Sequence, residues 1–185
     1  MSDILSLQNA PIKETKALPT SANATEQFLR LHLIPDTTAI LPIQQLVEVL
    51  AIPMGEIVPI AHMPPWVMGV HNWRGEILWM VDLGHRIGLP PWHQQGMGIS
   101  NHTGVVLQLR YGQTNSTHNN SQMVGLVVNR VEDIEWCNPD EIQSPPSGTT
   151  TPQIAPFLRG YWVNSTGEIL TVIDGRAIME GMEKV

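Results

Sequence analysis

The sequence has little cysteine, little positive charge and no clustered basic residues, and each shortage excludes a class of protein. Cys137 is the only cysteine among 185 residues, so neither an internal disulfide nor a CxxC zinc motif can form. Lysine and arginine together number 10 against 17 acidic residues, and they are scattered along the chain. Proteins that bind nucleic acid or anionic lipid use clustered basic residues, so we predict neither partner.

The sequence also lacks the hydrophobic segments that direct a protein to or through a membrane. No apolar run approaches the ~18 residues that span a bilayer. The opening stretch, MSDILSLQNAPIKETK, does not place a basic region before an apolar core, as a secretory signal does. We therefore expect a cytoplasmic protein without direct membrane insertion.

What the sequence does contain is typical of a small globular β protein. Hydrophobic residues make up 42% and charged residues 15%, while 15 prolines and 15 glycines indicate many turns and few long helices. Residues 1–26 are polar and predict a mobile tail, and residues 27–185 predict one domain of two halves. Because about ten short strands are separated by turn residues, we predict an all-β fold, either a barrel or a sandwich.

Apolar periodicity and turn residues place the individual elements. Leucines alternate with polar residues over 29–33, as in a half-buried strand. The segment PIQQLVEVLAIP fits a helical stripe and a strand face equally well, and we expect one helical turn at 43–46 followed by a strand at 47–52. The other expected strands lie at 38–41, 66–73, 76–82, 104–110, 123–129, 131–136, 160–164 and 168–173.

A short motif occurs twice and suggests an internal duplication. GEILWMVD begins at Gly75 and GEILTVID begins at Gly167, and a second glycine, Gly69 or Gly160, precedes each copy. In each copy a glycine permits close backbone approach, a tight turn follows, and a strand ends at an aspartate. We interpret the copies as equivalent units of two barrels related by an approximate two-fold axis. The alternative is a chance recurrence among strand-turn sequences.

Candidate catalytic and metal-binding residues have simpler structural explanations. Asp82 and Asp174 are expected to cap the helices at 83–88 and from 174 onward, rather than to form a catalytic carboxylate pair. Seven histidines show neither HExxH nor i, i+4 pairing, and neither GxGxxG nor GxxxxGK[ST] occurs. We predict no enzymatic activity, no metal and no cofactor. A small enzymatic or ligand-binding β-barrel that uses histidine and aspartate residues is the alternative.

The segment WVMGVHNWRGEILWMVDLGHRIGL resembles the signature of the CheW-like domain family, which is close to G-V-x-N-x-R-G-x-I-x-P-V-V-D-L-x-x-x-L-G. The segments FLRLHLI, ILPIQQLVEVL, VGLVVNRVEDIEW and FLRGYWVNSTGEILTVID extend the resemblance over most of residues 28–182. It implies two five-stranded antiparallel β-barrels of the SH3-like type, with short flanking helices. It also implies a non-catalytic adaptor that couples methyl-accepting receptors to a CheA-type histidine kinase.

Several positions depart from the family pattern. Trp73 replaces the usual leucine, Trp79 replaces the usual proline, and His71 stands where a small residue is common. Such variants are similar to adaptors of phototaxis and of motility driven by type IV pili. The receptor, its stimulus and the motor output therefore stay open among chemotaxis, phototaxis and pilus systems. Trp73 and Trp79 flank a turn, so either one is an interface anchor or both fill the barrels.

The resemblance further implies a partner-binding surface. Arg74 falls on the arginine of the family's N-x-R-G motif and Glu48 on its usual glutamate, so a salt bridge is expected beside a receptor-binding groove between the barrels. Apolar residues near Val124 and Leu126 are expected to face the groove from the second barrel. The implied partners are the kinase regulatory domain and the cytoplasmic tip of a receptor within an array. The predicted binding residues are Glu48, Val49, Val70, Asn72, Trp73, Arg74, Gly75, Val124 and Leu126.

Overall fold

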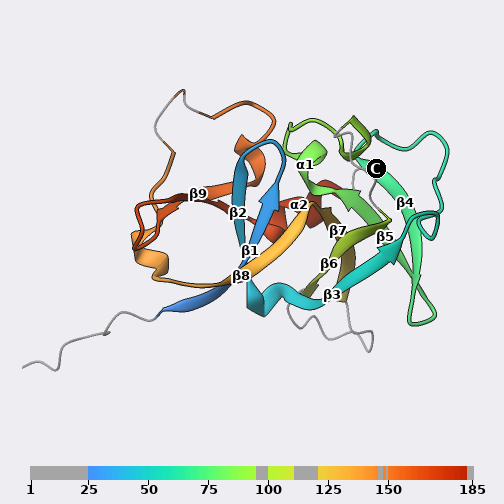
Figure 1. Cartoon of the computed structure of the whole chain (residues 1–185), viewed down its shortest axis with the longest axis horizontal. Coiled ribbons are helices and arrows are strands. Elements are labelled where there is room, and N and C mark those ends of the chain that lie inside the picture. The colour runs from blue at the N-terminus through green and yellow to red at the C-terminus, as the bar shows by residue number, and fades with distance from the viewer. Residues whose placement is uncertain (1–24, 95–99, 111–120, 146–147, 149, 183–185) are drawn as a thin grey trace, which may run out of the picture.

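The computed structural model describes residues 25–182, apart from residues 95–99, 111–120, 146, 147 and 149. The predicted mobile tail therefore lies almost wholly outside the described residues, and so does the polar loop after residue 110. Two five-stranded sheets lie side by side, with the C-terminal helix α2 (Gly175–Met182) between them (Figure 1). The all-β fold with two five-stranded units is confirmed.

The chain builds one sheet, passes through the whole of the other, and then returns. We call the first sheet the terminal barrel. It contains β1 (Glu26–Leu33), β2 (Thr37–Pro42), β8 (Arg130–Cys137), β9 (Leu158–Val163) and β10 (Ile169–Ile173), in the order β8-β1-β2-β10-β9. We call the second the central barrel. It contains β3 (Leu46–Pro53), β4 (Val67–Trp73), β5 (Glu76–Asp82), β6 (Asn101–Arg110) and β7 (Ser121–Val128), in the order β3-β6-β7-β5-β4.

The helices are short and lie between strands or at the end of the chain. The α-helices are α1 (Leu83–Arg86) and α2, and the 3-10 helices are η1 (Ile43–Gln45), η2 (Trp92–Gln94), η3 (Pro139–Glu141) and η4 (Ala155–Phe157). The helical turn followed by a strand that we predicted for PIQQLVEVLAIP is present as η1 and β3.

The prediction of purely antiparallel barrels is wrong for one strand pair in each sheet. The β2–β10 pair and the β5–β7 pair are parallel, and the other pairs are antiparallel. Hairpin partners must run antiparallel, whereas strands joined through intervening elements are free of that constraint. Because β5 and β7 are separated by β6, and β2 and β10 by the central barrel, local patterns in the sequence carry no signal for their direction.

The repeated motif marks equivalent places in the two barrels. After β3 the chain reaches Val58, which pairs with Val70 on β4 and so joins the two edge strands of the central barrel. In the terminal barrel, Gln143 follows β8 and pairs with Tyr161 on β9.

Gly69 and Gly160 allow these two closures. A Cβ at either position would overlap the carbonyl oxygen of the opposing residue, Val58 or Gln143. The duplicated unit is therefore the closure of each barrel, followed by a hairpin whose second strand lies inside the sheet.

Both aspartates that end the repeated motif cap helices, as predicted. The Asp82 side chain accepts a hydrogen bond from the His85 backbone N–H, and the Asp174 side chain accepts one from the Arg176 backbone N–H. Asp82 also accepts a hydrogen bond from the backbone N–H of Trp92, so it holds the chain after α1 against the end of β5.

Three clusters of buried apolar side chains form the core. One fills the central barrel around Leu78 and Met80, and one fills the terminal barrel around Phe28 and Trp162. The largest cluster lies between the barrels and takes residues from both sheets and from α2. Since burial of apolar surface is the main stabilising contribution, this shared cluster binds the two barrels into one unit.

Candidate protein-binding surface

Glu48 and Arg74 form the salt bridge that the family resemblance implies. Glu48 lies on β3 and Arg74 lies in the turn between β4 and β5, and β3 and β4 are the two edge strands of the central barrel. Arg74 Nη2 is 2.8 Å from Glu48 Oε2, and the two side chains are 65% and 34% exposed. The pair is therefore available to a second protein.

The turn that carries Arg74 has a strictly defined backbone. Trp73 pairs with Glu76, so the loop contains only Arg74 and Gly75, whose φ angles are 54° and 85°. Two consecutive positive φ angles define the hairpin turn that favours glycine at its second position. The Asn72 side-chain oxygen accepts a hydrogen bond from the Gly75 N–H. Asn72 and Gly75 consequently fix the direction in which Arg74 leaves the hairpin.

Trp73 completes this small network from inside the barrel. Its indole N–H donates a hydrogen bond of 3.1 Å to Glu48 Oε2, and the Arg74 guanidinium carbon lies 4.8 Å from its ring centroid. Trp73 is buried in the core of the central barrel. It thus supports the salt bridge from behind, and its ring is not available as an interface anchor. The Trp73 indole is thus a donor that holds the Glu48 carboxylate in place.

The strand that carries Glu48 also exposes apolar residues to solvent. Val49 is 48% exposed and Val47 is 42% exposed on the same strand as Glu48, while Val70 is half-buried on β4. Val49 pairs with Val105 of the cluster between the barrels and Glu48 pairs with Val106 inside the central barrel, so their side chains leave opposite faces of β3. The strand thus carries both a charged pair and exposed apolar residues, the mixture of groups found at protein interfaces.

Val124 and Leu126 do not lie where the sequence prediction placed them. Both are on β7, which belongs to the same barrel as β3, and both are buried in the cluster between the barrels. The terminal barrel instead exposes Ile134 at 46% and Trp136 at 59% on β8. Sequence reasoning missed these two residues because they alternate with a glutamate, a pattern that suggests the apolar side faces the core.

The reason for this inversion is a charged group in the terminal barrel. Arg30 on β1 lies 2.6 Å from Glu132, 3.1 Å from Glu135 and 2.6 Å from Glu168. Burial alone would lower the pKa of Arg30, but the hydrogen bonds to these glutamates outweigh it and raise that pKa. The glutamates of β8 therefore turn toward Arg30, which leaves Ile134 and Trp136 on the opposite face.

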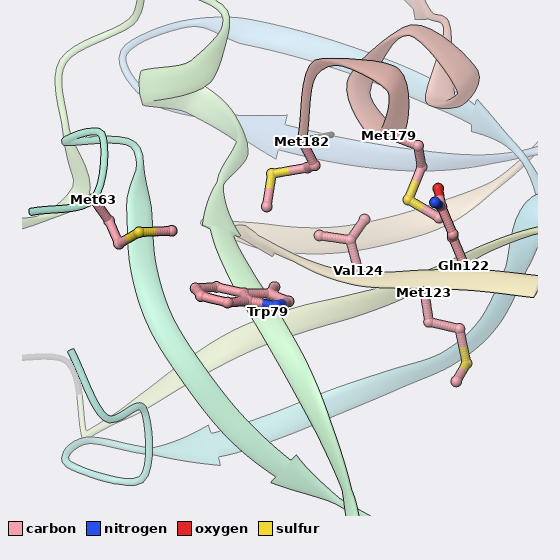
Figure 2. A pocket seen from close by; sticks show the side chains of 7 residues that line it. All are labelled: Met63, Trp79, Gln122, Met123, Val124, Met179 and Met182. Atoms are coloured by element: carbon pink, nitrogen blue, oxygen red, sulfur yellow. The ribbon is translucent and has the colours of Figure 1, made fainter. Parts of the chain in front are cut away.

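An apolar pocket of about 300 Å³ lies beside β5 and α2 (Figure 2). Trp79 forms its floor, and the side chains of Met63 and Met182 extend toward it from opposite sides. Methionine side chains are flexible and polarisable, so such a pocket adapts to apolar groups of different shape. The lining residues are Met63, Trp79, Gln122, Met123, Val124, Met179 and Met182, and none of them is charged.

The titratable residues do not gather into a reaction centre within the described part of the chain. Burial raises the pKa of the Cys137 thiol to about 11, so this cysteine is not a thiolate at neutral pH. His102 is buried against Trp92, with ring centroids 4.6 Å apart, and burial lowers its pKa. Over the described ranges, no three His, Cys, Asp or Glu side chains come together as a metal site. No described helix is long and apolar enough to cross a membrane.

Paired five-stranded barrels, interleaved in one chain and joined by a common core, define the structural class of this protein. The chain belongs to the CheW-like domain family, whose model matches residues 28–183.

Among solved structures it is similar to the crystal structure of the scaffolding protein TtCheW from Thermoanaerobacter tengcongensis. That match has a TM-score of 0.64 and 19% sequence identity, and it covers 82% of this chain and 90% of that chain. No curated protein matches the chain in a sequence comparison. Family membership thus rests on the family model, and the shared fold is shown by the structural match.

Proposed function

We propose that this protein is a non-catalytic adaptor that couples a methyl-accepting receptor to a CheA-type histidine kinase. Membership of the CheW-like domain family supports this role, and the similar TtCheW is described as a scaffolding protein. The observation that carries the proposal is the exposed Glu48–Arg74 pair, whose arginine lies on a tight hairpin turn, together with the exposed valines on the same strand as Glu48. Such an adaptor acts in the cytoplasm, in arrays of receptors that serve chemotaxis, phototaxis or pilus-driven motility.

The adaptor joins its partners by holding two surfaces at a fixed separation. The receptor contributes the helical hairpin at its cytoplasmic tip, and the kinase contributes its regulatory domain. When one partner is bound, the second contact becomes intramolecular within the array, so two weak contacts suffice for stable assembly. The shared core between the barrels suits this role because it keeps the two surfaces from moving independently.

The receptor surface contains Glu48, Val49 and Arg74 from the central barrel. Val70, Asn72, Trp73 and Gly75 support it from β4 and the turn. From the terminal barrel, Ile134 and Trp136 of β8 take the place that we first gave to Val124 and Leu126. β3 and β8 both flank the core between the barrels, since Leu46 and Val131 pack against the same cluster.

The salt bridge contributes to recognition more than to stability. An exposed ion pair stabilises a protein by only ~0–1 kcal/mol. We expect Arg74→Glu to leave the unfolding temperature within about 2 °C of the wild type, because the residue is 65% exposed. The same change places two glutamates side by side and should weaken binding of the partner more than about tenfold.

The test is isothermal titration calorimetry with two purified partners, a receptor tip fragment and a kinase regulatory domain. Arg159→Glu is the matched control, since it makes the same charge change at an exposed residue of β9. The proposal requires that Arg74→Glu lose at least one partner while Arg159→Glu keeps both. Binding of neither partner by the wild-type protein, or wild-type affinity for both in Arg74→Glu, contradicts it.

A further inference from the structure

A cleft of about 750 Å³ opens where the two barrels meet, and it shares no residue with the surface around Arg74. The segment before β4, the helix α1, the segment before β9 and the helix α2 form its walls. Its apolar lining comes from Pro64, Trp66, Pro152, Pro156, Phe157 and Ala177, and its polar side chains are those of His85, Arg86, Gln153 and Glu180.

Arg86 sits between two aromatic rings that come from different barrels. Its guanidinium carbon lies 4.0 Å from the ring centroid of Trp66 and 4.5 Å from that of Phe157. A guanidinium flanked by rings offers its N–H donors at the edge of its plane rather than over its faces. The edge is the part of the group that matches a planar carboxylate.

The charge of Arg86 is not neutralised by the part of the chain that the structure describes. The ion pairs of the described residues involve Arg30, His71, Arg74 and Arg130, and Arg86 takes part in none of them. Its Nε is buried without a hydrogen-bond partner. Burial lowers the pKa of Arg86, yet an arginine stays protonated at neutral pH. A cation of this kind gains from any anion that reaches its edge.

The composition of the cleft decides which anion suits it. Glu180 lines the same cleft and partly offsets the attraction of an anion to Arg86. That net attraction grows in proportion to the charge of the ligand, whereas the cost of desolvating the ligand grows with the square of its charge, so a carboxylate is favoured over a doubly charged phosphate. The volume of the cleft is larger than a small free carboxylate would occupy. Trp66 and Phe157 line the cleft, and grooves lined by aromatic rings are the kind of surface on which extended, proline-rich peptides lie. The chemistry therefore favours a peptide segment with an acidic side chain.

We propose that this cleft binds an extended segment of a partner protein and that the segment places one aspartate or glutamate carboxylate against the edge of Arg86. The proposal does not depend on the receptor and kinase contacts above. The cleft is then a third binding surface of the molecule. It attracts an anion, although the chain as a whole is acidic. Glu180 acts as a selectivity residue, since it disfavours groups with more than one negative charge.

The test uses the full chain labelled with nitrogen-15 and four probes. Three are heptapeptides of the sequence Gly-Pro-Pro-X-Pro-Pro-Gly, in which X is glutamate, glutamine or phosphoserine, and the fourth is sodium phosphate. The Trp66 indole resonance, assigned with Trp66→Phe, reports occupancy of the cleft. We expect the glutamate peptide to bind about tenfold more tightly than the glutamine peptide, as a charge-assisted hydrogen bond predicts. Phosphate alone is expected to leave the resonance unchanged.

Variants assign the effect to individual residues. Arg86→Gln should weaken the glutamate peptide about tenfold, and Glu180→Gln should strengthen it, because the repulsion of the incoming carboxylate is removed. Arg159→Gln lies outside the cleft and should change nothing. If Arg86→Gln unfolds because the aromatic stack is lost, Glu180→Gln decides the matter, since Glu180 is exposed.

Four results would overturn the proposal. They are no shift of the Trp66 indole by the glutamate peptide, equal affinity for the glutamate and glutamine peptides, tighter binding of the phosphoserine peptide, and an unchanged affinity in Glu180→Gln. Arg74→Glu should bind the peptide as the wild type does. Loss of the adaptor contacts and loss of the cleft are therefore separate outcomes.

Discussion

At the scale of single residues, charge decides which way side chains face in the terminal barrel. Arg30 is only 19% exposed and lies against three glutamates, two on β8 and one just before β10. A partly buried arginine with several carboxylates is stabilised by charge-assisted hydrogen bonds, and its removal leaves those carboxylates close together. The orientation of β8, and with it the exposure of Ile134 and Trp136, depends on this one cation.

We expect Arg30→Met to lower the free energy of unfolding by about 2–3 kcal/mol at pH 7. Arg130→Met is the matched control. Arg130 is 65% exposed and contacts only Glu132 in the described part of the cluster, so its loss should cost less than about 1 kcal/mol. Urea unfolding of the three proteins measures both values, and equal effects of the two substitutions would contradict the assignment.

The pH dependence of this cluster has a definite sign. Hydrogen bonds from Arg130 and Arg30 hold the pKa of Glu132 below its usual value of 4.5. A carboxylate with a lowered folded-state pKa contributes stability above pH 4.5, and this contribution is lost as the pH falls through the lowered value. The difference between wild type and Arg30→Met should therefore shrink below pH 4.5. Urea unfolding between pH 3 and pH 7 tests this, and a constant difference would refute it.

Single residues also show what the sequence could and could not predict about the candidate site. The Glu48–Arg74 pair was predictable because both residues belong to motifs that the family resemblance covers. The burial of Trp73 was not, because a strand that flanks a turn alternates between core and solvent and the sequence does not say which face is inside. Leu126 was expected on the other barrel. The strand that carries it, β7, lies between β6 and β5 in the central barrel, and the sequence does not say to which sheet a strand belongs.

At the scale of elements, local patterns predicted most strands and both caps, but not their assembly. The boundary of β6 differs by three residues, since the strand begins at Asn101 where we expected Gly104. To predict the two parallel pairs, one would have to know which strands meet in space although they are far apart in the sequence. The repeat GVHNWRGEIL and GYWVNSTGEIL was the strongest long-range signal in the sequence. Each copy marks the place where the edge strands of one barrel are joined.

The two copies differ by one residue, and the hairpins explain the difference. The first hairpin loop contains two residues, Arg74 and Gly75, with positive φ at both. In the second, Asn164 pairs with Glu168, so the loop contains residues 165–167 and only Gly167 has a positive φ. The longer loop is the familiar alternative to a two-residue turn. Only the central barrel therefore presents an arginine on a tight two-residue turn.

The close backbone approach that closes each barrel predicts how much stability is lost when its glycine is replaced. In Gly160→Ala the new Cβ would lie 2.5 Å from the Gln143 carbonyl oxygen and 2.7 Å from Ile142 Cγ2. The oxygen cannot retreat without breaking the backbone pairing of Gln143 and Tyr161, so we expect a loss of about 3 kcal/mol. Gly167→Ala meets no atom within 4 Å and should cost only about 1 kcal/mol for its φ of 83°. Urea unfolding compares the two, and equal losses would show that the closure does not constrain the backbone.

At the scale of the whole molecule, the two barrels form one folding unit. The largest core cluster contains Leu31 and Leu41 from the terminal barrel, Leu107 and Leu126 from the central barrel, and Ile178 from α2. Each barrel has a smaller cluster of its own, so neither carries most of the buried apolar surface alone. The interleaved chain adds to this coupling, because the whole central barrel lies in the sequence between the two parts of the terminal barrel.

A single cooperative transition should follow from that arrangement. We expect the calorimetric and van't Hoff enthalpies of unfolding to agree, and the indole resonances of Trp73 and Trp162 to disappear at the same urea concentration. Leu107→Ala should lower the stability by about 2–5 kcal/mol and shift both resonances together, because its side chain lies between the barrels. Phe28→Ala inside the terminal barrel and Val106→Ala inside the central barrel are the controls, and each should also move both resonances. If Phe28→Ala moves Trp162 alone and Val106→Ala moves Trp73 alone, the barrels unfold separately, and a rigid link between the two binding surfaces is ruled out.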